Sequence, residues 1–466
     1  MIERNFIKYC INNLNQELFH LEDKKISNFR FLGFINDALD ILKKRKIKKG
    51  NKVIIKIYDQ FFWIIFYIAI KLYGAIPILV NPKLKKKIIS KICRENQSNY
   101  LITNKDIFIF KKNINKKNLI KFKKKNLNNK ISDYNLKKNS ISEIIYTSGS
   151  TNEPKGVMLT NSNINYIASQ INKVIKINKN DFELLSLPLF HSFGLGRLRC
   201  FMLKPHKIAL NENASNIAKN LVLIGLYKIN IFSLVPSSIE IYKKFNKKII
   251  NQVGNLIKKI ELGSEKISAV NRNWLLKNFK KSKIFHHYGM TEASRSAFKI
   301  YSNKKKYPIN YTLTPGVKIK ISNIRKKNNN KKLGEILLKG RSITNSYVNK
   351  NLNNQKFIKK YLKTGDIGEI NIKKKKFKLL GRIDRNIKIS GINVNLDSLE
   401  NLIKKNFNLL YCDSSLKNNK IILIVNSKNK ILKNKIISYV YYNFGLKISI
   451  KTNNYKKNSG KIKLLI

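Results

Sequence analysis

One short stretch of hydroxyl residues, glycine and lysine is the part of the chain best suited to chemistry. Residues 147–151 are Thr147, Ser148, Gly149, Ser150 and Thr151, and Lys155 follows them. In such a loop, backbone N–H groups and hydroxyls surround phosphate oxygens, and the lysine supplies positive charge. Pro154 stands where a Walker loop needs its second glycine, so this is a different kind of phosphate loop. The stretch predicts a polyphosphate site, and the alternative is a polar surface loop.

Predicted secondary structure flanks this loop on both sides. Residues 141–146 are mostly apolar and rich in isoleucine, which is typical of a buried strand. Beyond the loop, apolar residues recur at spacings of three and four from Ile164 to Val174, which predicts an amphipathic helix. We expect Asn161 or Ser162 to cap that helix.

Three further predicted strands run into distinctive polar segments. Strands at 184–188, 257–262 and 284–285 are expected to end there, and the segments after them are Phe190–Gly194, Gly263–Glu265 and His286–Glu292. In an open parallel sheet, ligands bind at the carboxyl ends of the strands. Together with the phosphate loop, these ends therefore predict one shared site.

The order of elements predicts the fold class. Strand-like and helical runs alternate from about Asn51 to Met290, which indicates an α/β fold with mostly parallel sheets. Residues 309–380 are expected to be β-rich. After about Gly381 the pattern changes to a small α+β unit, with helices near 396–407 and 431–444 and strands near 420–426 and 447–452. We predict an N-terminal domain at 1–381 and a mobile C-terminal domain at 384–466.

Charge and cysteine content limit the function classes. The chain has 466 residues and a formal net charge of +69, which by itself would suggest a nucleic-acid partner. The lysines are spread along the chain among many Ile and Asn residues, which favours compositional drift, so no specific nucleic acid is expected. Cys10, Cys93, Cys200 and Cys412 form no close pair, which indicates a reducing, cytoplasmic setting and no zinc site.

One apolar segment raises the question of a membrane span. It covers residues 61–80, but Lys71, Gly74 and Pro77 interrupt it. We therefore interpret it as a buried helix followed by a strand, and no membrane span is predicted.

The phosphate loop, residues 288–292 (Tyr-Gly-Met-Thr-Glu) and later motifs together resemble the acyl-adenylate-forming superfamily, which includes acyl-CoA and aryl-CoA synthetases. The later motifs are Lys363–Asp366, Gly381–Asp384, Lys388–Gly391 and Ser459–Lys461. Six motifs in the order of the family, over more than 300 residues, make the resemblance specific. It implies an AMP-forming acid–thiol ligase that uses ATP, Mg²⁺ and CoA, or the phosphopantetheine of an external carrier protein.

The resemblance also implies roles for individual residues. Thr147–Thr151 and Lys155 would hold the β- and γ-phosphates, and Gly263, Ser264 and Glu265 would face Tyr288 across the adenine. Thr291 would contact the α-phosphate, Glu292 would bind Mg²⁺, and Asp366 would accept hydrogen bonds from both ribose hydroxyls. The remaining roles are ribose and phosphate contact for Arg382, hinge for Asp384, lining of the thiol approach for Gly391, and contact with the carboxylate and α-phosphate for Lys461.

The reaction that the resemblance implies agrees with these residue types. A carboxylate attacks the α-phosphorus of ATP, and since the nucleophile is already an anion, no general base is needed. Catalysis would come from alignment and charge neutralisation, for which Mg²⁺, Lys155, Arg382 and Lys461 are suitable.

His191, Phe193 and His287 are expected to line the acyl pocket. Adenylating enzymes for α-amino acids usually carry an aspartate in the segment that matches 190–194, and this chain has none there. We therefore expect a fatty, branched or aryl acid. His286 and His287 could suggest a metal pair, but adjacent residues of a strand face opposite sides, which favours a pocket wall at His287.

Two alternatives stay open at this stage. The enzyme could load a separate carrier protein in place of CoA. The chain could also be a binding-only relative that has lost activity, or a basic RNA-binding protein.

Overall fold

The computed structural model describes most of the chain as two compact units. The described residues are 2–22, 24–106, 137–147, 154–211, 216–303, 307–328, 331–371, 376–383, 385–389, 392–409, 411–417, 420–427, 429–444 and 446–452. Unit 1 comprises residues 1–318, 338–362 and 466, and unit 2 comprises residues 319–337 and 363–465. The predicted site residues outside the described ranges are Ser148, Gly149, Ser150, Thr151, Asp384, Gly391 and Lys461.

Unit 1 contains two sheets, called here sheet A and sheet B. Sheet B has the strand order β17 (Ser346–Tyr347), β7 (Lys155–Thr160), β6 (Ile141–Thr147), β4 (Ile76–Leu79), β3 (Lys52–Lys56), β5 (Tyr100–Thr103). The strands of sheet A in unit 1 are β14 (Tyr311–Leu313), β13 (Ser294–Tyr301), β12 (Lys283–Met290), β11 (Lys259–Leu262), β10 (Ile231–Leu234), β8 (Phe182–Leu185), β9 (Lys207–Leu210), β1 (Glu17–His20), β2 (Lys25–Ser27). The central pairings β12–β11–β10–β8–β9 and β6–β4–β3–β5 are parallel.

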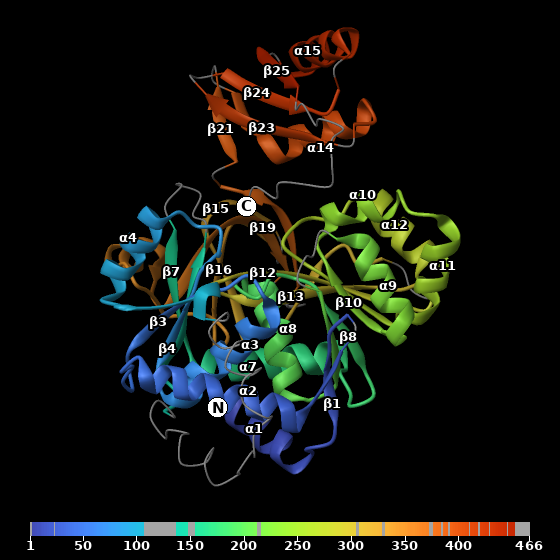
Figure 1. The fold of residues 1–466 in the computed structure, drawn as a ribbon. Helices are drawn as coiled ribbons and strands as arrows, with labels where there is room; N and C mark the ends of the chain where they lie inside the picture. The colour runs from blue at the N-terminus through green and yellow to red at the C-terminus, as the bar shows by residue number, and fades with distance from the viewer. Residues whose placement is uncertain are drawn as a thin grey trace. The chain divides into compact units, whose positions relative to one another are not determined.

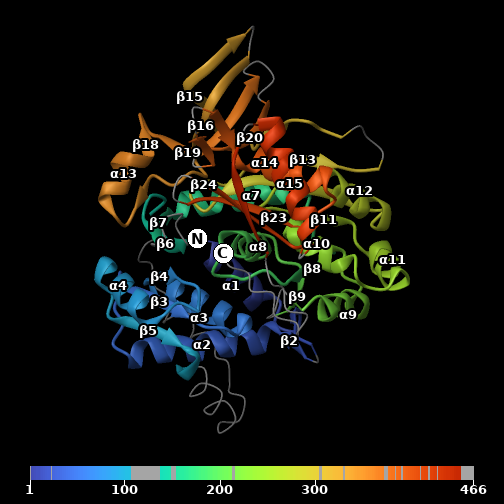
Figure 2. The ribbon, with the colours of Figure 1, turned by 90° about the horizontal axis from the view of Figure 1, so that it is seen from above.

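Helices fill the space between these sheets and cover their outer faces (Figure 1 and Figure 2). The middle helices are α1 (Ile2–Asn12), α2 (Asn28–Lys44), α3 (Gln60–Tyr73), α7 (Asn161–Ile175) and α8 (Ser192–Leu203). Helix α4 (Lys86–Asn96) covers the outer face of sheet B. The outer face of sheet A carries α9 (Ile217–Tyr227), η1 (Pro236–Ser238), α10 (Ile239–Tyr242), α11 (Lys247–Leu256) and α12 (Ala269–Asn278). Helix α13 (Lys350–Lys356) and strand β18 (Phe357–Ile358) complete the unit.

The two-residue period of the strands explains this layering. In β3, Val53 and Ile55 join the core between the sheets, whereas Ile54 packs on the α4 side. In β11, Ile260 and Leu262 point to the outer helices, and the residue between them, Glu261, points inward. Both faces of these strands are buried, so their central residues are apolar, except for Glu261, which pairs with Arg295.

The interpretation of residues 61–80 as a buried helix and a strand is confirmed. Helix α3 begins after Asp59, whose carboxylate accepts the Phe62 N–H, and ends at Gly74, which has a φ of 88°. Strand β4 follows and pairs in parallel with β3. Within the described ranges no helix is long and apolar enough to cross a membrane.

The predicted cap of α7 is wrong, and one strand before the helix was not predicted. The helix is capped by Thr160, whose hydroxyl accepts the Asn163 N–H while the Asn163 side chain accepts the Thr160 N–H, and neither Asn161 nor Ser162 is the cap. The chain also enters α7 through strand β7, which pairs antiparallel with β6. Strand β7 (Lys155–Thr160) is defined by its pairing with β6 and β17, and the sequence analysis assigned no strand to these residues.

Unit 2 is β-rich and has a small core of its own near the C-terminus. Its strands are β15 (Val317–Asn328), β16 (Lys331–Gly340), β19 (Tyr361–Asn371), β20 (Lys376–Arg382), β21 (Asn386–Ile389), β22 (Ile392–Asn395), β23 (Cys412–Lys417), β24 (Lys420–Val425) and β25 (Ile448–Thr452). The helices are α14 (Leu396–Asn406) and α15 (Lys430–Phe444), which pack on β23–β25 through Leu399, Ile403, Ile436 and Val440. The predicted helices and strands after residue 390 are confirmed, and the predicted domain boundary stays a prediction.

A buried ionic cluster ties the middle helices to sheet B. Lys71 Nζ lies 2.5 Å from Glu3 Oε1 and 3.6 Å from Glu143 Oε2, and Tyr67 donates to Glu143 at 2.6 Å. Arg199 donates to the other oxygen of Glu143. Since these groups are removed from water, each charge depends on its partners.

Replacing Lys71 with methionine should destabilise unit 1 by about 3–5 kcal/mol, because Glu3 is left as a buried unpaired charge. Adding Glu3→Gln to Lys71→Met should recover part of that loss. Thermal unfolding of the wild type and both variants would test this, and a single variant as stable as the wild type would contradict it.

Candidate active site

The strands that bracket the predicted phosphate loop form a hairpin. Thr147 at the end of β6 is directly opposite Lys155 at the start of β7. A Cβ at Gly156 would lie 2.7 Å from a Val348 methyl and 2.9 Å from the Tyr146 ring, so only glycine fits there. The Val348 N–H donates to the Gly156 carbonyl at 2.8 Å. The hairpin therefore fixes both ends of the loop against residues 346–348.

Strand β17 connects this hairpin to Glu292. Tyr347 pairs with Val157 of β7, and its hydroxyl donates to Glu292 Oε1 at 2.9 Å. Burial, and then the adjacent Glu292 carboxylate, raise the pKa of Tyr347, so the phenol stays protonated and donates. The Thr344 N–H donates to the Glu292 carbonyl at 2.7 Å. Two hydrogen bonds thus hold Glu292 beside the strand that starts at Lys155.

Glu292 is suited to hold Mg²⁺. Tyr347 occupies one carboxylate oxygen, and the main-chain bond from Thr344 fixes the backbone. Mg²⁺ commonly binds one or two carboxylates together with substrate phosphates and water, and needs no protein cage. Within the described ranges no group of three or more His, Cys, Asp or Glu could form such a cage. A phosphate-bound Mg²⁺ therefore fits this carboxylate.

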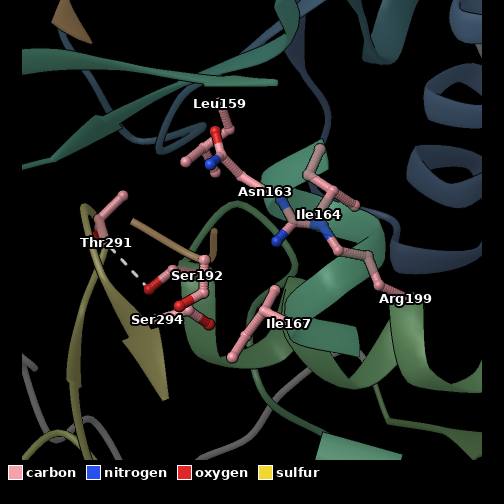
Figure 3. A pocket seen from close by; sticks show the side chains of 9 residues that line it. Leu159, Asn163, Ile164, Ile167, Ser192, Arg199, Thr291 and Ser294 are labelled. Carbon is pink, nitrogen blue, oxygen red and sulfur yellow. Dashed lines mark hydrogen bonds between the residues drawn. The ribbon is translucent and has the colours of Figure 1, made fainter. Parts of the chain in front are cut away.

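Thr291 connects Glu292 to the start of helix α8. Its hydroxyl donates to Ser192 Oγ at 3.4 Å, the dashed line in Figure 3. Behind this contact lies a cavity of about 10 Å³, enough for about one water. Its lining comes from β7, α7, α8, the ends of β12 and β13, and residue 342: Leu159, Asn163, Ile164, Ile167, Ser192, Arg199, Thr291, Ser294, Ser342.

The predicted acyl-pocket residues His191 and Phe193 lie at the start of α8. His191 is the N-cap residue, and burial lowers its pKa to about 4, so its imidazole is neutral at physiological pH. The helix start packs closely on the preceding loop, because a Cβ at Gly194 would lie 2.4 Å from the Pro188 carbonyl oxygen. Phe193 meets His287 edge to face, with ring centroids 4.7 Å apart. The structure thus brings together Phe193 and His287 from segments almost 100 residues apart.

The segment Gly263–Glu265 follows β11 and is held by two neighbours. The Glu265 carboxylate accepts from the N–H and the hydroxyl of Ser237 at 2.9 and 3.0 Å. His286 Nε2 lies 2.9 Å from the Glu265 carbonyl oxygen. Ser264 has a φ of 71°, a strained value for a residue other than glycine.

Residues 286–290 belong to strand β12, so the strand extends beyond the end that we predicted at residue 285. Strand β12 continues to Met290 and pairs antiparallel with β13, with a register shift between Tyr288 and Gly289. A Cβ at Gly289 would lie 1.5 Å from the Ser294 carbonyl oxygen, so this bulge needs glycine. His286 and His287 face opposite sides as predicted, since His286 contacts Tyr311 and His287 contacts Phe193. Tyr288 is buried and lies beside Tyr311.

A buried arginine and a buried glutamate contact the predicted acyl-pocket residues Phe193 and His287. Arg295 donates to Glu261 at 3.0 Å, to the Ser192 carbonyl at 3.0 Å and to the Phe193 carbonyl at 2.9 Å. Glu261 also contacts Arg197, at 3.4 Å. Burial alone would raise the pKa of Glu261, but Arg295 and its other charged neighbours hold that pKa well below its usual range. Glu261 is therefore a carboxylate.

The sequence analysis did not identify Tyr347, Glu261 or Arg295. Tyr347 had no local motif, because its contact with Glu292 spans 55 residues. Glu261 and Arg295 did leave a signal, since each is a charged residue inside an otherwise buried stretch. A buried charge needs a partner, so such residues mark internal networks.

The predicted ribose residues of unit 2 are paired with each other. Asp366 and Arg382 are directly opposite in the β19–β20 ladder, and Arg382 Nη1 lies 3.2 Å from Asp366 Oδ1. Gly365 has a φ of 73°, and its N–H donates to Glu335 at 3.1 Å. This turn and the pairing place a carboxylate and a guanidinium side by side, a suitable arrangement for a ribose and a phosphate.

Residues 38–348 match a family model described as AMP-binding enzyme. Among curated proteins, the chain is 28% identical over 272 residues to 4-coumarate–CoA ligase from Pinus taeda, which covers 55% of this chain and 50% of that protein. It is 23% identical over 430 residues to 4-coumarate–CoA ligase 2 from Nicotiana tabacum, which covers 86% of this chain and 77% of that protein. The match thus spans half to three quarters of these relatives.

Solved structures of similar fold cover nearly the whole chain. O-succinylbenzoate coenzyme A synthetase from Bacillus subtilis, in complex with AMP, aligns with a TM-score of 0.77 at 19% identity. The alignment covers 98% of this chain and 96% of that chain. At this identity the likeness shows the fold.

His286 gives a prediction about pH and stability. Burial lowers its pKa in the folded protein to about 4, from an ordinary value of 6.5. The unfolded chain therefore binds the extra proton first, and this contribution to stability is lost as the pH falls from 6.5 to 4. Between pH 7 and 4.5 the wild type should lose about 2–3 kcal/mol more than His286→Gln. Urea unfolding of both proteins at the two pH values would test this, and equal losses would contradict it.

Proposed function

Because this chain belongs to the AMP-binding enzyme family, we propose that it activates an organic acid with ATP and Mg²⁺ as an acyl-adenylate and transfers the acyl group to CoA. The predicted resemblance, the α/β fold class and the class of AMP-forming acid–thiol ligase are confirmed by the comparisons. ATP, Mg²⁺ and CoA are the cofactors that they support.

The observation that carries the proposal is a chain of contacts within unit 1. Lys155 and Gly156 start β7, β7 pairs with β17, and Tyr347 of β17 holds Glu292. Thr291, next to Glu292, then contacts Ser192 at the start of α8. The residues proposed to bind phosphate, Mg²⁺ and the acyl group come from distant parts of the sequence. They are nevertheless connected by these contacts.

In the proposed adenylation step, the substrate carboxylate attacks the α-phosphorus and pyrophosphate leaves. Lys155 and the loop before it would hold the β- and γ-phosphates, and Glu292 would hold the Mg²⁺ that neutralises them. Thr291 would donate to the α-phosphate. In unit 2, Asp366 and Arg382 would bind the ribose, Asp384 would act as hinge, and Lys461 would contact the carboxylate and the α-phosphate. Tyr288 would stack on adenine opposite Gly263–Glu265.

The proposed substrate is an aryl acid without an α-amino group. The predicted pocket side chains His191, Phe193 and His287 are flat rings, which suits a planar acid. Glu261 is the buried carboxylate beside them, but its oxygens already accept from Arg295 and Arg197. It cannot also neutralise a substrate ammonium, and an unpaired buried ammonium is costly. The curated relatives from pine and tobacco are named for an aryl acid, which agrees with this choice.

CoA is the proposed acceptor, and Gly391 would line its approach. Loading of a carrier protein is the alternative, and no specific nucleic-acid partner is proposed. The proposed setting is the cytoplasm, where ATP and CoA are both supplied.

Carboxylate-dependent ATP–pyrophosphate exchange tests the first half-reaction without any thiol. The wild type should exchange with aryl acids, and Lys461→Ala should lower the rate by roughly 10²–10³-fold. The same variant should largely keep thioester formation from supplied acyl-AMP and CoA. If no acid supports exchange in folded protein that binds ATP, the proposed function is wrong. If both half-reactions fall equally in Lys461→Ala, the role of Lys461 is wrong.

Tyr347→Phe should weaken Mg²⁺ binding during exchange by about 10-fold or more, because Glu292 loses the hydroxyl that orients it. The Mg²⁺ concentration for half-maximal exchange would be measured at saturating ATP. Tyr166→Phe removes a hydroxyl that donates to the Pro315 carbonyl at 2.9 Å, away from Glu292, and is the matched control. An unchanged Mg²⁺ requirement in Tyr347→Phe would argue against Glu292 as the metal residue.

A further inference from the structure

His287 lies between a buried carboxylate and the first residue of the Gly263–Glu265 segment. Its Nδ1 is 2.8 Å from Glu261 Oε1, in a contact bent away from ideal hydrogen-bond geometry. Gly263 packs against the Cε1 edge of the ring, where a Cβ would lie 2.0 Å from His287 Cε1 and 2.2 Å from Nε2. Only glycine leaves space for the imidazole at this point. Nε2 is therefore at the carboxyl end of β11, where ligands of such sheets bind.

The surroundings of the ring determine which nitrogen carries the proton. Arg295 and Arg197 keep Glu261 ionised. A lone pair on Nδ1 would face this carboxylate at 2.8 Å and be repelled, so Nδ1 carries the hydrogen. Burial lowers the pKa of His287 more than Glu261 raises it, so the ring is neutral. Nε2 is then an unprotonated acceptor, and no described residue donates a hydrogen bond to it.

The same arginine fixes the neighbouring wall of the pocket. Arg295 holds the carbonyls of Ser192 and Phe193, and a Cβ at Gly196 would lie 1.9 Å from Arg295 Nη1. The Phe193 ring meets His287 at 90° with centroids 4.7 Å apart. Glu261 and Arg295 thus fix the positions of two groups: the Phe193 ring, which is an apolar wall, and the His287 imidazole, which offers a polar acceptor.

Resting on the proposed function, we propose that His287 is a specificity-determining residue whose Nε2 accepts a hydrogen bond from the organic part of the acid. The site would therefore select acids that carry a hydroxyl or N–H donor over acids of the same shape without one. A buried acceptor left without its donor is costly, which is the physical source of the selection.

Matched pairs of acids in the exchange assay test this inference. The probes are benzoates and cinnamates that carry a ring hydroxyl or amino group, each compared with its unsubstituted and methoxy analogues. For at least one ring position the wild type should favour the donor acid by tenfold or more in kcat/KM. In His287→Phe that ratio should fall to near one, whatever the change in kcat/KM for the unsubstituted acid.

His286→Gln is the matched control, because the adjacent imidazole faces Tyr311 on the other side of the strand. It should keep the donor preference of the wild type. A preference that survives in His287→Phe, or is absent from a wild type that exchanges with aryl acids, would overturn the inference. Absence of exchange with every acid would instead count against the proposed function.

If His287→Phe fails to fold, the protonation state of His287 in the wild type still tests the inference, and this measurement does not depend on turnover. The chain has five histidines, so ¹⁵N-histidine spectra of the wild type can be assigned by single replacements. His287 should be neutral from pH 6 to 8 with its proton on Nδ1. A proton on Nε2 would overturn the inference, and Glu261→Gln should weaken the Nδ1–H preference.

Discussion

The pairing of Glu261 with Arg295 is the interaction on which the candidate site depends most. Both residues are buried, so neither charge is stable without the other. Arg295 comes from β13 and Glu261 from β11, and the remaining donors of Arg295 hold the carbonyls at the start of α8. One guanidinium therefore links strands β11 and β13 to the start of helix α8. Because its fork has a fixed geometry, a lysine in its place could not make the same set of contacts.

Helix α8 extends this constraint to the other sheet. Arg197 and Arg199 are two residues apart, about 200° around the helix, so they point to roughly opposite sides. Arg197 donates to Glu183 of sheet A at 2.6 and 2.7 Å, and Arg199 donates to Glu143 of sheet B. Glu143 lies on β6, the strand that ends at Thr147. The predicted acyl-pocket residues at the start of α8 are thus fixed in position relative to the β6–β7 hairpin.

Much of this arrangement could be predicted from local sequence, because strand ends and motif order are local properties. Lys155, Thr291 and Glu292 were predicted as site residues from their motifs, and the helices and strands after residue 390 were predicted from their periodicity. The errors lie where tertiary structure determines the outcome. Residues 286–290 form a strand because β13 pairs with them, and no local sequence pattern predicts this pairing. Glu3, Lys71 and Glu143 form one cluster across 140 residues, which a single sequence cannot show.

The charges of the two buried networks are balanced. In the two buried networks the acids Glu3, Glu143, Glu183 and Glu261 pair with the bases Lys71, Arg197, Arg199 and Arg295. These sets balance, so the net charge of +69 resides elsewhere, on the lysine-rich remainder of the chain. A net charge of this sign attracts ATP, CoA and carboxylates without distinguishing among them. Under the proposed function, discrimination between acids would come from the neutral interior, where His287 and Phe193 are held by the balanced networks.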